Sequence, residues 1–346
     1  MKRVCYLYEK FIALDNFQRA ARLLGKNKPK NRKAQWIKRH FEEYGAKIHE
    51  QVKRGYQFKE PRKTTIIDNY KGKQRNLKIP HLDDQIVHIA WLNIAVPIIE
   101  RHNYFYNCGS IPGAGQQRAV KALKKWFRNP KLKYGATLDI RKFYETCPHE
   151  AVMQGLRRMI KDEAFLKVTQ EIMDTMSDNG VGLAIGYPVS HWFANVALTH
   201  IDHELKRNFP EVKMARYMDD IALLSANKRK LRRCILWIKA EIEKKGMALK
   251  KWAYQTLENG LTFLSYRFYH GYVLMIKALM IRIARRFRRA KMNVHTARGL
   301  ISYFGILKFC NSLNFRKTNV YPYANFNHLR KVVSNYDKGI LLERAC

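Results

Sequence analysis

Two adjacent aspartates, Asp219 and Asp220, lie between two apolar runs in the segment 215–224. This pattern predicts a tight hairpin that holds both acids at its tip, at the edge of a sheet. Two carboxylates so close together do not both stay ionised cheaply without a cation beside them. Mg²⁺ is the natural partner, because it binds through one or two carboxylates together with the phosphates of a substrate.

A third acid, Asp139, follows a short strand-like segment that begins at Ala136. A strand ending in this carboxylate and laid beside the hairpin would complete a site for two metal ions about 4 Å apart, which suits phosphoryl transfer. A purely structural role for the three acids is the alternative. The other aspartate pair, Asp83 and Asp84, opens a predicted helix, where acids suit the positive end of the helix dipole.

The composition indicates a nucleic-acid partner. The 346 residues include 66 Lys and Arg against 28 Asp and Glu, a formal net charge of +38. Self-repulsion on this scale destabilises a compact chain unless a polyanion neutralises it. Because 47% of the residues are hydrophobic, the chain can still bury a core, which excludes a disordered basic tail.

The six cysteines are scattered along the chain, without the spacing of a disulfide framework or a zinc module. This favours a reducing, cytoplasmic setting. The longest apolar stretch, 89–99, is interrupted by Asn93 and Pro97 and is too short to cross a membrane. The N-terminus also lacks the pattern of a secretory signal, so we expect no association with a membrane.

The elements that would position the acids form an α+β pattern, with many helices and few strands. Strands are expected at 64–67, 75–79 and 134–140, on both sides of Asp219 and Asp220, and as a pair near Lys250 and Phe263. Helices are expected within 1–60, from His81 to about Arg101, and in a basic segment that begins near Arg118. Further helices are expected between the strand 134–140 and about residue 178, and at 190–207 and 228–245.

The segment 259–336 contains no Asp or Glu and 14 Lys or Arg. One helical face in it is apolar, with Ile276, Leu279, Met280, Ile283 and Phe287. A second stripe is basic, with Arg282, Arg285, Arg286 and Arg289. A solvated surface is the ordinary explanation of a charge run, but a run this long without acids favours a surface that tracks phosphates. The basic run 25–33 fits a solvated loop and a phosphate contact equally well.

The sequence around the three acids resembles the motifs of reverse transcriptases. The segment 217–220 resembles motif C, and Asp139 with Phe143 and Tyr144 resembles motif A. Further motifs follow in order over about residues 5–270: the fingers motif at 73–80 with Asp84, the fingers loop of bacterial group II intron enzymes at 108–115, motif B at 185–195 and motif E at 263–266.

Within the bacterial group II intron-like lineage, the chain is most similar to the reverse transcriptases of diversity-generating retroelements, by its length, basicity and motif B. The residues that depart from the family patterns are Gln85, His191, Ala253 and Ser265. None of them removes a metal ligand, although His191 replaces the Gln typical of that branch. Lys250 and Lys251 are candidates to replace the lysine of motif D.

The resemblance implies a right-hand polymerase with the α+β fold. Residues 1–133 would be the N-terminal helices and fingers, with part of the junction to the palm. Residues 134–268 would be the palm with its small antiparallel sheet, and 269–346 the basic helical thumb. The implied activity is RNA-directed DNA polymerisation, with error-prone copying of a template repeat.

The resemblance also assigns site residues. Asp139, Asp219 and Asp220 would be catalytic, and together with Ile140 they would bind two Mg²⁺, for which Mn²⁺ is an alternative. The nucleotide-binding residues would be Lys73, Arg75, Phe143, Tyr144, Ser190 and His191. Tyr144 would lie under the sugar and disfavour a 2′-hydroxyl, and His191 would influence fidelity. The template and primer would be bound by Arg282, Arg285, Arg286 and Arg289.

The implied partners are an RNA template, a DNA or RNA primer, deoxynucleoside triphosphates, a structured non-coding RNA and a small basic accessory protein, in a bacterial or phage-encoded system. Two alternatives stay open. One is a defence-type reverse transcriptase related to retron or abortive-infection enzymes. The other is a catalytically idle RNA-binding scaffold on a polymerase fold.

Overall fold

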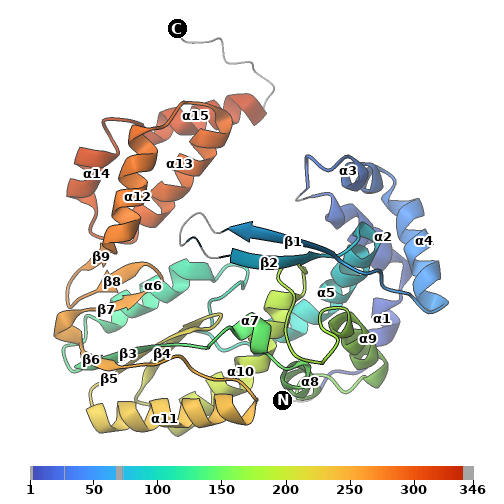
Figure 1. The fold of residues 1–346 in the computed structure, drawn as a ribbon, viewed down its shortest axis with the longest axis horizontal. Coiled ribbons are helices and arrows are strands. Elements are labelled where there is room, and N and C mark those ends of the chain that lie inside the picture. The colour runs from blue at the N-terminus through green and yellow to red at the C-terminus, as the bar shows by residue number, and fades with distance from the viewer. Residues whose placement is uncertain (1–2, 27, 68–71, 73, 338–346) are drawn as a thin grey trace.

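The computed structural model describes residues 3–26, 28–67, 72 and 74–337 (Figure 1). The N-terminal helices are α1 (Leu7–Phe11), α2 (Leu14–Leu24), α3 (Arg32–Arg39) and α4 (Phe41–Lys53). They are followed by the hairpin of β1 (Arg62–Ile67) and β2 (Gln74–Ile79) and by the helices α5 (Leu82–His102) and α6 (Gly115–Trp126). The predicted hairpin and long helix are therefore confirmed within two residues at each end.

A four-stranded antiparallel sheet occupies the centre of the molecule, in the order β4 (Lys213–Tyr217), β5 (Asp220–Ser225), β3 (Tyr134–Asp139) and β6 (Tyr254–Thr256). The helices inserted between these strands are α7 (Phe143–Thr146), α8 (His149–Arg157), α9 (Glu163–Asp174), α10 (Ser190–Asn208) and α11 (Lys228–Lys244). A 3₁₀ turn, η1 (Leu257–Asn259), leads out of β6.

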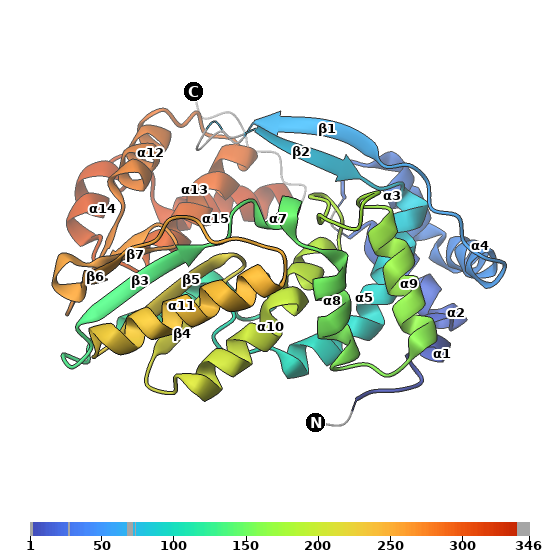
Figure 2. The same ribbon diagram turned by 60° about the horizontal axis from the view of Figure 1, so that its bottom comes forward.

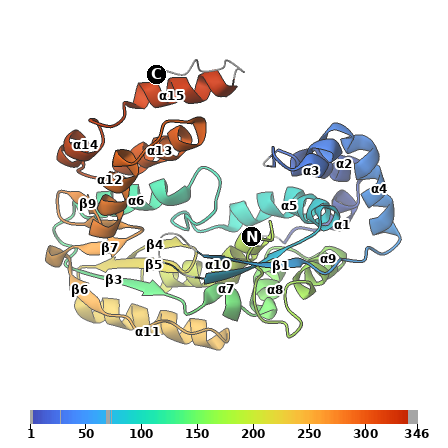
Figure 3. The same cartoon turned by 45° about the horizontal axis from the view of Figure 1, so that its top comes forward.

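Both faces of this sheet are covered, because successive side chains of a strand point to opposite faces. Ile221 and Leu223 of β5 join a first hydrophobic core, which includes α5, α10 and α11. Ala222 and Leu224 join a second core, which includes α6 and the C-terminal helices. Figure 3 shows α11 on one side of the sheet and α6 on the other. The continuous apolar run of β5 is thus the pattern of a strand buried on both faces.

The C-terminal part begins with a small antiparallel sheet of β7 (Leu261–Phe263), β8 (Tyr266–Phe268) and β9 (Val273–Met275). The helices α12 (Lys277–Arg288), α13 (Val294–Leu307), α14 (Leu313–Asn319) and α15 (Phe326–Asp337) follow. Leu279, Ile283 and Phe287 of α12 are buried, which confirms the predicted apolar face. The strand predicted near Lys250 forms four residues later, as β6, and at Leu249 the structure has an isolated bridge to Ile140.

Helix α5 is the one helix of the described ranges that is long and apolar enough to cross a membrane. Of its most apolar stretch, 56% is buried inside the fold. It packs against α2, α1, α4 and α10. Figure 2 shows it among the N-terminal helices and α9. Its composition is therefore explained by its place in the first core.

His88 is a fully buried residue of α5 whose two ring nitrogens have no hydrogen-bond partner. Its ring lies between those of Phe58 and Tyr187, at centroid distances of 6.0 and 5.1 Å. Burial lowers the pKa of His88 to about 3, so the imidazole is neutral in the folded protein.

The burial of His88 makes folding stability depend on pH. Below a pH of about 6.5 the imidazole of His88 is protonated in the unfolded chain, whereas in the folded chain it stays neutral down to about pH 3. The free energy of unfolding should therefore fall by about 1.4 kcal/mol for each pH unit below 6.5. In urea unfolding between pH 7 and pH 4, His88→Leu should show a shallower loss than the unsubstituted protein. Parallel curves for the two proteins would contradict this explanation.

Candidate active site

Asp219 and Asp220 lie where β4 turns into β5, as predicted. Tyr217 and Asp220 face each other across the two strands, and Met218 and Asp219 form the turn between them. Met218 has a φ of 57°, in the left-handed region that side chains other than glycine rarely adopt. Such a conformation costs about 1–2 kcal/mol, so the rest of the fold must hold the turn in place.

Asp139 ends β3 directly opposite Asp220 of β5. Directly opposite residues in an antiparallel pair project from the same face, with Cβ atoms about 5 Å apart, and like charges in such a pair repel each other. Oδ1 of Asp139 is buried without a hydrogen-bond partner, while Oδ2 accepts from Lys250 Nζ at 2.7 Å. An orphaned carboxylate oxygen beside a second carboxylate is a suitable pair of ligands for a divalent cation.

The carboxylates lie at a cavity of about 440 Å³, whose lining includes Asp139, Asp220, Gln116 and the turn 263–265. Within the described ranges no three His, Cys, Asp or Glu side chains converge on one point. The opposed pair of Asp139 and Asp220 is thus the part of the predicted site that the structure brings together, with Asp219 next to it in the turn. Ile140 is fully buried, so only its main chain is available to a ligand.

Lys250 provides the positive charge that accompanies Asp139, and its ion pair is partly exposed to solvent. A lysine at this place competes with a metal ion for the carboxylate. Lys250→Ala should therefore tighten Mn²⁺ binding, by about two- to fivefold, as expected for the loss of a partly exposed charge pair. Calorimetric titration with Mn²⁺ measures this, with Lys251→Ala as the neighbouring control. Weaker binding in Lys250→Ala would show that the lysine supports the metal site instead.

A buried network supports the turn from behind. Arg216 of β4 is fully buried, and its guanidinium donates to both carboxylate oxygens of Asp202, at 2.6–3.0 Å. Nη1 of Arg216 also donates to the Met218 carbonyl at 3.0 Å and to Asn195 Oδ1 at 3.2 Å. The residue before Asp219 is thereby fixed to α10.

The loop between α5 and α6, which contains Gly109, contacts this network on its other side. Asn195 donates to the carbonyl of Gly109 at 2.8 Å. A Cβ on Gly109 would lie 2.4 Å from the Met218 nitrogen, so the loop approaches the turn at a distance that only glycine allows. The sequence pattern did not predict that Arg216 and Asp202 support the site. The one indication in the sequence was Arg216 itself, a charged residue inside an otherwise apolar strand.

A second cavity, of about 580 Å³, lies between β2, α7 and the segment 176–185. Arg75 and Tyr144, two of the predicted nucleotide-binding residues, both line it. The pKa of Tyr144 is raised by burial and by the negative charge of Asp219, and Arg75 opposes this rise. The phenol is therefore protonated and lies in the electrostatic field of both Asp219 and Arg75.

The strand β2 is attached to the loop before α10. The Lys78 amide donates to the Ile185 carbonyl at 2.9 Å, and Lys78 Nζ donates to the Met176 carbonyl at 2.7 Å. Gly186 has a φ of 113°, and a Cβ there would lie 2.5 Å from the Lys78 carbonyl oxygen. This close approach requires glycine and fixes one wall of the cavity.

Two predicted nucleotide-binding side chains face away from the cavity. Phe143 is 2% exposed and packs in the first core. Ser190 is also buried, and its hydroxyl donates to the Ala184 carbonyl at 2.6 Å. Both side chains therefore pack behind the cavity, and the assignment of Phe143 and Ser190 as nucleotide-binding residues stays a prediction. The ring of His191 packs against Trp192, and burial lowers its pKa. Lys73 lies outside the described residues.

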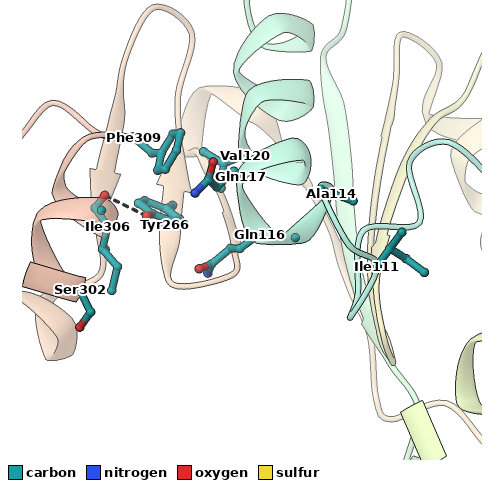
Figure 4. A pocket seen from close by; sticks show the side chains of 12 residues that line it. Ile111, Ala114, Gln116, Gln117, Val120, Tyr266, Ser302, Ile306 and Phe309 are labelled. Carbon is teal, nitrogen blue, oxygen red and sulfur yellow. Dashed lines mark hydrogen bonds between the residues drawn. The ribbon is translucent and has the colours of Figure 1, made fainter. Parts of the chain in front are cut away.

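Another cavity, of about 450 Å³, lies between the start of α6 and the helix α13 (Figure 4). Gln116 lines both this cavity and that of the carboxylates, and its side chain donates to the Leu264 carbonyl at 2.7 Å. The Tyr266 hydroxyl donates to the Ile306 carbonyl at 3.0 Å and so joins β8 to α13. The two cavities adjoin and lead from the carboxylates toward the C-terminal helices.

The predicted basic stripe lies on α12 and at its end. Arg285, Arg286 and Arg289 are exposed, and Arg282 is half-buried. Arg288, which was not predicted to belong to the stripe, is exposed and donates to Asn319 Oδ1 at 2.9 Å. Most of this charge therefore faces solvent, on the far side of α12 from the second core.

A sequence model of the family described as reverse transcriptase (RNA-dependent DNA polymerase) matches residues 61–268. Protein YkfC of Escherichia coli K12 is 26% identical over 159 residues, which span 43% of this chain and 42% of YkfC. The fold is similar to that of apo telomerase from Candida tropicalis, with a TM-score of 0.54 at 12% identity, over 82% of this chain and 59% of that chain.

Telomerase from Candida tropicalis in complex with the TWJ fragment of telomeric RNA gives a TM-score of 0.51 at 12% identity, over 86% of this chain and 57% of that one. The chain therefore spans less than two thirds of the length of each of these relatives. The structural similarity confirms the predicted α+β, right-hand polymerase fold.

Proposed function

Because the chain belongs to the reverse transcriptase family, we propose that it copies an RNA template into DNA by two-metal nucleotidyl transfer. The observation that carries this proposal is the pair of Asp139 and Asp220 on one face of the sheet, with an orphaned oxygen on Asp139. The neighbouring Asp219 acts on the pKa of Tyr144, which lines the second cavity together with Arg75.

The residues have distinct roles in this proposal. Asp139, Asp219 and Asp220, with the main chain of Ile140, hold two Mg²⁺ or Mn²⁺ ions, which when bound neutralise the charge that develops on the transferred phosphate. Arg75 binds the triphosphate through its planar fork of donors. The basic stripe of α12 contacts the backbone of the template and primer. These partners, and the deoxynucleoside triphosphates, follow from the family.

Extension of a DNA primer on an RNA template tests the proposal. The full chain, supplied with Mg²⁺ and deoxynucleoside triphosphates, should lengthen the primer. The same reaction with a DNA template shows whether RNA is preferred. Complete absence of product on both templates, from protein that binds the primed template, would contradict the proposed activity.

Tyr144 should set the choice of sugar. Its ring lies in the nucleotide cavity, where it would collide with a 2′-hydroxyl. Tyr144→Ala should raise the use of CTP relative to dCTP by about tenfold or more, the effect of opening space in a selective pocket. Single-nucleotide incorporation kinetics measure this ratio. Tyr144→Phe keeps the ring and should keep the selectivity, and an unchanged ratio in Tyr144→Ala would remove the residue from this role.

For the biological role we propose error-prone copying of a template repeat in a diversity-generating retroelement of a bacterium or phage, within the cytoplasm. The motif resemblance supports this role, with 1–133 as fingers, 134–268 as palm and 269–346 as thumb. A structured RNA and a small basic accessory protein would take part. His191→Gln tests the proposed effect on fidelity, because an unchanged spectrum of errors on an RNA template would contradict it.

A defence role is the alternative, and the neighbouring DNA separates the two. A template and variable repeat pair next to an accessory gene supports diversification, whereas a toxin or effector gene supports defence. The other alternative, an idle RNA-binding scaffold, does not require the opposed carboxylates of Asp139 and Asp220 or the orphaned oxygen on Asp139.

A further inference from the structure

The surface of α3 is a basic region far along the chain from the predicted thumb. From Asn16 to Phe41 the sequence contains nine Lys or Arg and no acid. A cavity of about 510 Å³ opens on α3, and the residues that line it include Lys30, Arg32, Lys33, Trp36 and Arg39. We call these five residues the α3 surface. Figure 1 shows α3 beside α2 and α4, on the opposite side of the molecule from α12–α15.

Trp36 provides an aromatic face in the middle of this charge. It is 45% exposed, which is unusual for so large an apolar side chain. Its ring stacks on His40, with centroids 4.5 Å apart and an angle of 25°, and meets the edge of Tyr44. His40 Nδ1 lies 3.0 Å from the Trp36 carbonyl oxygen. The indole is therefore supported on one side while much of its surface stays open to a ligand.

The positive charges of the α3 surface are available to a ligand as well. Within the described residues, no ion pair joins Lys30, Arg32, Lys33 or Arg39 to a carboxylate, although Lys33 lies close enough to help lower the pKa of Asp83. The helix turns its apolar side chains, Ala34 and Ile37, into the fold, both at 0% exposure. The basic side chains are consequently held on the outer face, around the open ring.

The α3 surface is joined to the nucleotide side of the site. The Lys28 side chain, in the loop before α3, binds the side-chain oxygen of Gln85. Gln85 in turn donates to the carbonyl of Pro80 at 2.7 Å, and Pro80 directly follows β2. Arg75, in the same strand β2, lines the nucleotide cavity, so these contacts connect the far end of that strand to the loop before α3.

We propose that the α3 surface binds single-stranded RNA, with its phosphates on Lys30, Arg32, Lys33 and Arg39 and one unstacked base on Trp36. Basic grooves with exposed aromatic rings bind single strands in this way, since every base has a face that stacks. Bases inside a duplex cannot reach the indole, which favours an unpaired strand. The RNA is either the unpaired 5′ part of the template or an unpaired loop of a separate RNA; the first identity rests on the proposed function.

Fluorescence anisotropy with the full chain tests this proposal. The probes are a DNA primer on an RNA template with a 5′ single-stranded overhang, the same duplex without an overhang, and free single-stranded RNA. Trp36→Ala should weaken binding of the overhang probe about tenfold, as expected for loss of one stacked base. Binding of the blunt duplex should not change. Trp36→Phe keeps an aromatic face and should restore most of the affinity.

The charges are tested separately. Replacing Arg32, Lys33 and Arg39 together by Gln should reduce the slope of log affinity against log salt by about 2 on the overhang probe, about 0.7 for each phosphate contact. The matched control replaces Arg229, Arg232 and Arg233, three exposed arginines of α11 on the far face of the sheet. This control should leave the slope on the overhang probe unchanged.

The three probes give distinct outcomes. A loss of affinity for the overhang probe supports template binding, and a loss of affinity for free RNA alone supports a separate RNA as the ligand. If Trp36→Ala and the triple variant bind the overhang probe and free RNA as tightly as the unsubstituted protein, the proposal is overturned. An equal loss of affinity for the blunt duplex would also overturn it. The assay needs no nucleotide, so an inactive polymerase would still return a result and the two proposals fail independently.

Discussion

Asp219→Asn should lower the rate of DNA synthesis about a thousandfold or more. The change removes one of the negative charges that, in the proposed function, would hold two divalent ions, and such ions supply several kcal/mol of charge stabilisation in the transition state. Each 1.36 kcal/mol corresponds to a factor of ten in rate. Asp219 is half-buried in the turn between two strands and belongs to neither hydrophobic core, so the substitution leaves both cores intact. Single-turnover primer extension on an RNA template measures the effect.

The matched control is the other aspartate pair of the chain. Asp83 opens α5 and binds Tyr44 and Lys59 at 2.8 and 3.1 Å, away from the sheet. Asp83→Asn should leave the rate of synthesis within about threefold, since Asp83 lies outside the proposed metal site and its ion pair with the exposed Lys59 affects stability by only about 1 kcal/mol. If Asp219→Asn extended primers as fast as the unsubstituted protein, the chain would act as an RNA-binding scaffold.

Asp202→Ala should lower the free energy of unfolding by about 3–5 kcal/mol, because it leaves the guanidinium of Arg216 buried without its carboxylate. Both side chains are almost completely inaccessible to solvent, at 0% and 3% exposure. A loss of this size is a large fraction of the stability of an ordinary domain. Urea unfolding at neutral pH measures this loss of stability. The free energy of unfolding of Asp202→Asn should lie between those of the unsubstituted protein and Asp202→Ala.

A double variant separates stability from positioning. Asp202→Leu combined with Arg216→Met replaces the buried ion pair by apolar groups, which often restores stability. It also removes the donor that holds the Met218 carbonyl, so the turn that carries Asp219 loses its support. We expect a stable protein whose kcat falls while primed template still binds. Full activity in the stable double variant would show that the network has no positioning role.

The local parts of the site could be predicted from the sequence. A hairpin with two acids at its tip follows from the apolar runs beside Asp219 and Asp220, and a strand ending at Asp139 follows from its own short segment. The structure confirms both elements and pairs Asp139 with Asp220. These features depend on residues close together in the chain, which is why a pattern reveals them.

The supports of the site depend on contacts between distant residues. Arg216 finds Asp202 and Asn195 at separations of 14 and 21 residues, through the packing of α10 on the sheet. Phe143 and Ser190 belong to recognisable motifs, but a motif does not reveal which way a side chain faces. Near Lys250, the chain makes a single bridge to Ile140 and the lysine side chain binds Asp139, so the strand β6 begins only at Tyr254.

The exposed position of Trp36 on the surface could not be predicted from the sequence either. Its neighbours Ala34 and Ile37 are buried, whereas the indole is 45% exposed, and the sequence alone does not distinguish these positions in a short basic helix. The charge run before it indicated a phosphate contact and a solvated loop equally. The open ring within that charge is what the three-dimensional structure adds.

The division of the fold into two cores has a consequence for synthesis on the ribosome. Helix α6 contributes Ala119, Val120 and Leu123 to the second core, but the other side of that core comes from residues beyond Leu257. While the intervening segment is being translated, the apolar face of α6 has only part of its partners. Such transiently exposed surfaces are prone to aggregation. The apolar face of α6 is therefore fully covered only after the last quarter of the chain, which carries α12–α15, has been translated.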